Sequence, residues 1–122
     1  MSFEIQCSLG EVIDKVTILE LKSHYCKNKN QNNNIQKELN ILKSKLDTLY
    51  LNDELYDQLQ HTNSKLWKLE DHIRQKSKTK EYDDQYILFA EDIHKTNDLR
   101  ASIKKQLNLK YKSNIIEEKI YN

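Results

Sequence analysis

Glycine and proline are almost absent from this chain of 122 residues, which has one glycine and no proline. Phosphate-binding loops, the dinucleotide-binding fingerprint and the nucleophile elbow of hydrolases each require several glycines at fixed spacing. Tight β-hairpins also favour glycine, because their turns need residues with positive φ. The sequence therefore excludes these classes of site and disfavours a fold rich in hairpins.

Long apolar runs and an excess of charge of one sign are lacking as well. No run approaches the ~20 residues of a membrane-spanning helix, and no basic, apolar leader begins the chain. The formal net charge is +1, so no field over the whole chain steers it to nucleic acid. We expect neither a membrane partner nor a nucleic-acid partner.

Cysteine is scarce, and the two cysteines, Cys7 and Cys26, stand at the two ends of the first predicted helix. A helix of this length separates them by roughly 27 Å at 1.5 Å per residue, which is too far for a disulfide. Free thiols and the expected lack of a targeting signal predict a cytoplasmic protein, or one in the host cytoplasm if the protein is viral.

Amphipathic helices are what the remaining composition predicts, since 37% of the residues are hydrophobic and 32% are charged, with few helix breakers. Apolar residues recur at helical spacing in four stretches. A capping box, Ser8-x-x-Glu11, suits the start of the first, and Asp53 and Asp83 or Asp84 suit the starts of the third and fourth. We expect one all-α domain over residues 1–122.

The connections between these stretches are short, which forces neighbouring helices to run antiparallel. The polar tract Asn28–Asn34 and the basic run Gln75–Lys80 are predicted to be a loop and a turn, because they offer nothing to bury. Residues 114–122 form a tail with up to two turns of helix. The predicted architecture is an antiparallel bundle of about four helices, whose third and fourth helices form a long hairpin.

The first predicted helix is apolar on more than one side. One stripe consists of Leu9, Val12, Ile13, Val16 and Leu19, whereas Thr17, Ile18 and Leu21 lie on other sides. A helix of this kind is either central in a bundle or buried against a second copy. We expect a homodimer.

Polar residues interrupt the inward stripe of the fourth predicted helix. After an apolar start the same arc carries Asn97, Arg100, Lys104 and Asn108, and the third helix has a parallel line of Asn63, Trp67, Glu70 and Arg74. Buried charges need partners, and we expect Glu70 to pair with Arg100, with Asp14 as the second candidate. Convergence of these lines predicts a polar pocket with an aromatic wall for an anionic or hydroxyl-rich ligand. The alternative is a structural network of ion pairs.

Neither a metal, a cofactor nor a catalytic centre is indicated. Glu91-x-x-His94 has the spacing of di-iron bundles, but those sites need a second such motif and two further glutamates. All-α nucleotide pyrophosphohydrolases hold magnesium with paired acidic motifs, of which Glu11 and Asp14 resemble one half. An enzyme of that class is the weakest alternative.

Four stretches together resemble an uncharacterised family of small proteins known only as a domain of unknown function. They are Gly10–Lys22, Asn63–Arg74, Thr96–Asn108 and Ser113–Tyr121. The resemblance implies members in bacteria, phages and large DNA viruses, sometimes beside sugar-transfer genes, and no activity. Lys112 departs from the small residue expected before Ser113.

Two functional interpretations follow. The first is a protein accessory to glycan metabolism that binds an anionic or sugar-nucleotide-like ligand between the third and fourth helices. The second is a helical self-association or protein-interaction module with no small-molecule site. The candidate ligand-binding residues are Asp14, Lys15, Asn63, Trp67, Glu70, Arg74, Asn97, Arg100 and Lys104.

Overall fold

The computed structural model describes residues 1–121, and over these residues it contains five helices and no strand. The all-α prediction is therefore confirmed. The helices are α1 (Leu9–Tyr25), α2 (Lys29–Lys45), the short α3 (Thr48–Leu51), α4 (Glu54–Lys78) and α5 (Asp84–Lys110). None of the described helices is both long and apolar enough to cross a lipid bilayer.

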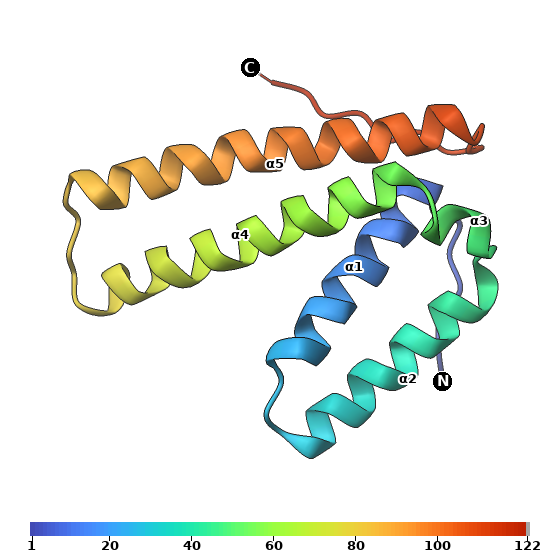
Figure 1. Ribbon diagram of the computed structural model, residues 1–122, viewed down its shortest axis with the longest axis horizontal. Coiled ribbons are helices and arrows are strands. Elements are labelled where there is room, and N and C mark those ends of the chain that lie inside the picture. Colours follow the sequence, from blue (N-terminus) through green and yellow to red (C-terminus); the bar gives the residue numbers. More distant parts are fainter. Residues whose placement is uncertain (122) are drawn as a thin grey trace.

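Two antiparallel hairpins make up the fold (Figure 1). One consists of α1 and α2, and the other is the long α4–α5 hairpin that the sequence predicted. The hairpins meet near the start of α1 and diverge toward their tips, so the architecture differs from a simple bundle of four antiparallel helices. Helix α1 packs against α2, α4 and α5 and is the central helix.

The core gathers around α1. It consists of Ile13, Val16, Leu19, Leu39, Tyr56, Leu59, Ile103 and Leu107. Because α1 has neighbours on several sides within one chain, its broad apolar surface needs no second copy to cover it. The homodimer stays a prediction, and the pattern on α1 no longer supports it.

Side-chain caps set most of the predicted helix starts. Ser8 accepts a hydrogen bond from the Glu11 amide, Asp53 caps α4 and Asp83 caps α5. Each cap satisfies an amide that has no partner inside its helix. The starts of α1, α4 and α5 therefore follow from local sequence.

The polar tract Asn28–Asn34 is helical, so its prediction as a loop was wrong. Asn28 caps α2 by accepting from the amide of Gln31 at 2.9 Å. Ser23 on α1 meets two side chains of α2, Asn32 at 3.3 Å and Gln36 at 2.6 Å. A neighbouring helix thus stabilises a tract that has little to bury.

Two other boundaries differ from the prediction. The apolar spacing predicts one helix from Ile35 to Asn52, whereas in the structure α2 ends at Lys45 and Asp47 caps the separate, short α3. Helix α4 continues to Lys78, through most of the run predicted as a turn. The shift in α4 adds a turn of helix that is largely exposed and therefore carries no apolar signal.

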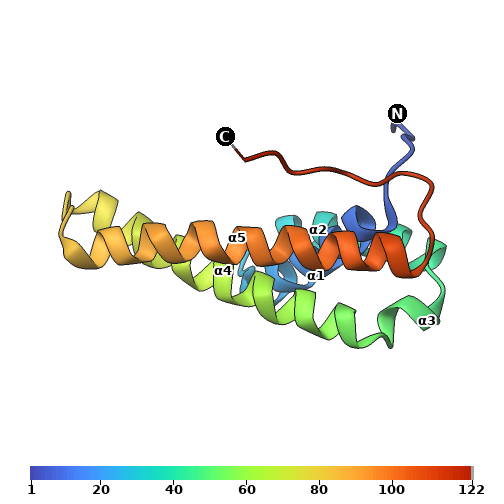
Figure 2. The same ribbon diagram turned by 90° about the horizontal axis from the view of Figure 1, so that it is seen from above.

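The C-terminal tail is extended and follows α5, as Figure 2 shows, so it has no helical turn among residues 113–121. Lys112 has a φ of 53°, in the left-handed region that favours small residues. The Ser113 amide then bonds the carbonyl of Asn108 at 2.8 Å, closing the end of α5. Ion pairs Lys105–Glu118 at 2.9 Å and Lys119–Asp98 at 2.7 Å hold the tail to the helix.

Candidate functional site

Asp14, on α1, is the centre of a polar network that joins three helices. Its carboxylate is 1% exposed. One oxygen accepts from Arg100 Nε at 2.9 Å and from Asn63 Nδ2 at 2.8 Å, and the other accepts from Arg100 Nη2 at 2.6 Å. Lys104 Nζ lies 3.9 Å from the second oxygen. The buried charge is therefore compensated by α4 and α5 together.

Thr17 completes the network one turn further along α1. Its hydroxyl donates to the carbonyl of Asp14 at 2.7 Å and accepts from Asn63 at 2.8 Å. Over the described residues, every buried polar side-chain atom has a partner. Sequence reasoning placed Thr17 on an apolar side of its helix and missed this role, although its spacing of three from Asp14 is a signal for it.

Arg100 is fixed in orientation by this arrangement. Two parallel N–H···O bonds to one carboxylate give the planar guanidinium a single geometry. The hydrogen bonds from Arg100 to Asp14 raise the pKa of the guanidinium, despite partial burial. Arg100 therefore stays charged while its side chain remains 29% exposed.

Glu70 is not the partner of Arg100, and that prediction was wrong. Asp14, the second candidate, takes both guanidinium bonds, whereas Glu70 is exposed on α4. The reason is the position of α1, which packs against both long helices and brings its own carboxylate to Arg100. Pairing within the α4–α5 hairpin was the assumption that failed.

A cleft of about 400 Å³ opens beside this network. It is lined by Ile18 and Leu21 from α1, by Asn97 and Arg100 from α5, and by Asn63, Leu66, Trp67, Glu70, Asp71 and Arg74 from α4. Six of the predicted ligand-binding residues therefore lie around one cleft, and Asp14 lies behind it as the residue that orients Arg100. Apolar side chains of α1 and α4 supply the rest of the wall.

Lys15 and Lys104, the other two predicted residues, do not line the cleft. Lys15 pairs with Glu38 of α2 at 2.9 Å. Lys104 pairs with Glu11 at 2.5 Å and lies on the other side of Asp14. Both lysines serve to attach α1 to its neighbours.

Trp67 is the aromatic wall of the cleft, and Tyr25 stacks on it. The ring centroids are 5.1 Å apart and the planes differ by 8°. Tyr25 lies in the last turn of α1, so the stack joins the end of α1 to α4. Such aromatic pairs contribute about 0.5–1.5 kcal/mol beyond the area they bury.

Gly10, the single glycine, lies where α1 touches α5. A Cβ atom there would stand 2.4 Å from the carbonyl oxygen of Lys104 and 3.1 Å from Asn108 Oδ1. The Gly10 amide donates to that same Asn108 oxygen at 2.7 Å. The missing side chain lets the two backbones approach closely, which holds Asp14, one turn after Gly10 on α1, near Arg100, one turn before Lys104 on α5.

A second polar cluster joins the start of α4 to the end of α5. Asp53 accepts from Lys110 Nζ at 2.6 Å, from the hydroxyl of Tyr111 and from the amide of Leu55 at 2.8 Å. The hydrogen bond from Lys110, followed by that from Tyr111, lowers the pKa of Asp53 to about 2. The sequence predicted the cap at Asp53 but gave no sign of its partners on α5.

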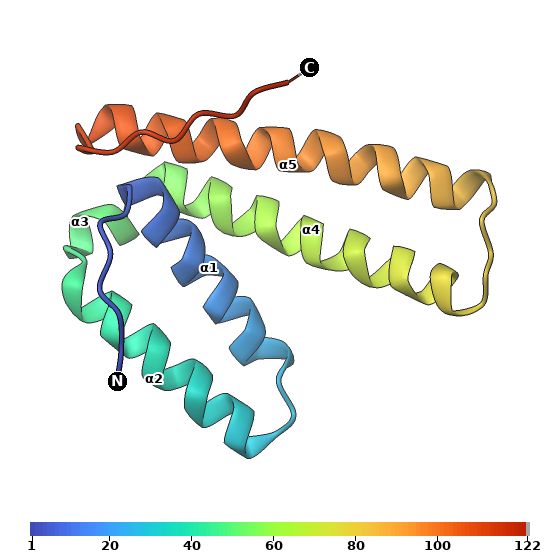
Figure 3. The same cartoon turned by 180° about the vertical axis from the view of Figure 1, so that it is seen from behind.

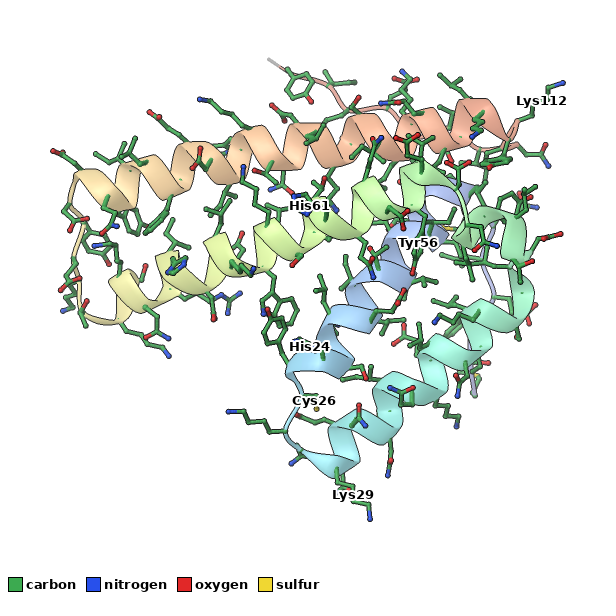
Figure 4. All side chains as sticks on the ribbon, in the orientation of Figure 1. His24, Cys26, Lys29, Tyr56, His61 and Lys112 are labelled. Atoms are coloured by element: carbon green, nitrogen blue, oxygen red, sulfur yellow. The ribbon has the colours of Figure 1, made fainter. Side chains whose placement is uncertain are left out.

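The histidines do not converge on a metal site. His24, near the end of α1, and His61, on α4, are labelled in Figure 4, and both line one hollow together with Glu20 and Asp57. Among residues 1–121, no group of three or more histidine, cysteine or acidic side chains has a geometry that could hold a metal ion.

The fold and this network define an all-α protein whose central helix is tied to a long helical hairpin through one buried carboxylate. The whole chain, residues 1–122, matches DUF6165, a family of unknown function. The chain belongs to this family, and the resemblance seen in the sequence is thereby confirmed. Neither a curated protein nor a solved structure matches it.

Proposed function

We propose that the protein binds a small, hydroxyl-rich ligand that carries an anionic group, such as a phosphorylated sugar, in the cleft between α1, α4 and α5. The observation that carries this proposal is the fixed guanidinium of Arg100. Asp14 occupies Nε and Nη2, and Nη1 has no hydrogen-bond partner among the described residues. Arg100 is thus a donor whose orientation is set before any ligand arrives, which lowers the entropy lost on binding.

Arg74 supplies a second cation at the same cleft. It is exposed, and it makes no ion pair within residues 1–121. Two guanidinium groups at one cleft can bind the oxygens of a phosphate or a carboxylate. Glu70 and Asp71 line the cleft too, so that, with Asp14 behind it, three carboxylates face two arginines. This excess of negative charge favours a ligand with one anionic group over a polyphosphate.

The remaining lining residues fit sugar hydroxyls. Asn97 offers both a donor and an acceptor, and Glu70 offers acceptors. Trp67 with Ile18 and Leu21 gives an apolar surface for the C–H groups of a sugar ring. Pockets of this kind combine apolar walls with a few polar groups that orient the ligand. A nucleotide-linked sugar with a diphosphate carries more negative charge, so the charges of the cleft rank it behind a sugar monophosphate. Either ligand would suit a role accessory to glycan metabolism.

The structure favours binding over magnesium-dependent hydrolysis. Glu11 and Asp14, the acidic residues that resemble half of a pyrophosphohydrolase motif, are occupied by Lys104 at 2.5 Å and by Arg100 at 2.6 Å. Carboxylates neutralised in this way are poor ligands for a hard cation. We therefore propose a binding protein and assign no reaction.

A titration tests the proposal. Isothermal calorimetry would compare a panel of phosphorylated sugars, the corresponding unphosphorylated sugars and inorganic phosphate. We expect a phosphorylated sugar to bind more tightly than either the unphosphorylated sugar or inorganic phosphate. Arg74→Gln should weaken the affinity for the phosphorylated sugar at least about tenfold, since charge-assisted hydrogen bonds contribute about 1.5–3 kcal/mol. Lys68→Gln is the matched control, because Lys68 is exposed on α4 outside the cleft. No binding by any member of the panel, or equal losses in both variants, would contradict the proposal.

A further inference from the structure

The first eight residues alternate strictly between apolar and polar side chains. Met1, Phe3, Ile5 and Cys7 alternate with Ser2, Glu4, Gln6 and Ser8. A period of two is the pattern of a β-strand with one apolar face. In the structure this N-terminal arm, residues 1–8, is not helical, and α1 begins directly after it.

The apolar face of the arm is largely exposed in the part of the chain that the structure describes. Phe3 is 85% exposed and Ile5 is 82% exposed. Among the described residues, no backbone–backbone hydrogen bond outside the helices involves residues 1–7. Both edges and one face of an extended segment are therefore open, which is the condition under which a strand pairs with another chain.

The arm crosses in front of α2 in Figure 3 and leads away from the helices toward the N-terminus in Figure 2. Glu4 lies 3.9 Å from Lys45, near the end of that helix. Ile41, one turn before Lys45 on the same face of α2, is 50% exposed. Glu4 thus brings the arm close to an exposed face of α2 that carries an apolar side chain.

We propose that a second copy of this chain covers this surface, and that the two N-terminal arms pair as antiparallel strands centred on Ile5. In this register Ile5 faces Ile5 and Phe3 faces Cys7 on the apolar side, while Glu4 faces Gln6 on the polar side. Directly opposed residues of antiparallel strands lie on the same face and interact most strongly. The segment is therefore complementary to itself.

The neighbouring registers are worse. Centring the pair on Glu4 sets two carboxylates directly opposite each other, which is destabilising. Centring it on Gln6 shortens the paired segment, because α1 begins at Leu9, and any odd shift sets apolar side chains against polar ones. An isolated two-stranded ribbon is marginal in water, so we expect the exposed Ile41, on the face of α2 that Glu4 approaches, to pack against the ribbon. We expect a dimer that forms with rising concentration.

Disulfide trapping tests the register. In a background of Cys7→Ser and Cys26→Ser, Ile5→Cys should form a covalent dimer under mild oxidation, because opposed residues of paired strands have Cα atoms about 4.5–5.5 Å apart. Glu4→Cys is the matched control. It lies next to residue 5, is equally accessible, and faces Gln6 of the second copy, so it should cross-link far less.

Light scattering tests the pairing without a cross-link. The dimer should form with rising concentration in the wild type and be lost in Ile5→Asp, which sets two carboxylates opposite each other. The melting temperature of the monomer should not change, since Ile5 packs on nothing in its own chain. A wild type that is monomeric at millimolar concentration would overturn the proposal, and a strand of another protein would then be the partner to test. Equal cross-linking through residues 4 and 5, or a dimer that survives Ile5→Asp, would also overturn it.

Discussion

Arg100→Met should destabilise the fold strongly, because it leaves the carboxylate of Asp14 buried without its main partner. Asp14 would keep one hydrogen bond from Asn63 at 2.8 Å and the distant ammonium of Lys104 at 3.9 Å. Removing one partner of a buried ion pair costs about 3–5 kcal/mol in the free energy of unfolding. Arg100 is 29% exposed and Lys104 can move closer, so we expect about 3 kcal/mol.

The double variant Asp14→Leu with Arg100→Met should recover part of that loss. With both charges gone, neither group is left uncompensated, and a buried pair replaced by apolar residues is often nearly neutral. The matched control is Glu70→Leu with Arg100→Met. Glu70 is exposed and makes no hydrogen bond to Arg100, so this double variant should recover nothing.

Urea unfolding followed by circular dichroism gives the free energies of unfolding of the wild type, of the single variants Arg100→Met, Asp14→Leu and Glu70→Leu, and of the two double variants. A coupling of about 1–3 kcal/mol between residues 14 and 100, and none between residues 70 and 100, is the expected result. The reasoning is refuted if Arg100→Met changes stability by less than about 0.5 kcal/mol, which is the range of ordinary surface substitutions. Recovery by the Glu70 change would refute the assignment of the partner.

Three further predictions concern other contacts. Gly10→Ala should lower the free energy of unfolding by about 1–3 kcal/mol, because the new methyl group meets the Lys104 carbonyl; a neutral or stabilising result in urea unfolding would contradict this. The pKa of Asp53 is about 2, below its ordinary 3.8. The ionised carboxylate therefore stabilises the fold fully above about pH 4, and this contribution to the free energy of unfolding is lost as the pH falls to about 2. Asp53→Asn keeps a helix cap but should flatten the stability profile between those pH values, and an unchanged profile would count against the assignment. Tyr25→Ala should cost about 1 kcal/mol and shift the fluorescence of Trp67, the single tryptophan, to the red, whereas an unchanged spectrum would show that the two rings do not stack.

Local chemistry in the sequence predicted most of the helical framework. The capping box at Ser8 and the aspartates at positions 53 and 83 fixed three helix starts, because a cap acts within one turn of its own helix. The tract Asn28–Asn34 was mispredicted because its helix depends on α1, through contacts such as Ser23 with Gln36 at 2.6 Å. Long-range stabilisation of this kind leaves no periodic signal in the sequence.

The sequence predicted most of the residues that line the candidate site, but it did not predict which acid pairs with Arg100. Helical spacing was enough to gather Asn63, Trp67 and Arg100, because each lies on one arc of a long helix. Which acid meets Arg100 depends on where α1 crosses the hairpin, and Gly10 governs that crossing through its contact with α5. A glycine that permits a close approach cannot be told by sequence alone from one that ends a turn.

The central claim, that the cleft between α1, α4 and α5 binds a hydroxyl-rich anionic ligand, is tested most directly by a crystal structure of the protein soaked with a phosphorylated sugar. We expect density for the ligand beside Trp67, with its phosphate within hydrogen-bonding distance of Arg74 and of Nη1 of Arg100, while the pair between Arg100 and Asp14 stays intact. An empty cleft at millimolar ligand, or a ligand bound only elsewhere on the molecule, would contradict the account.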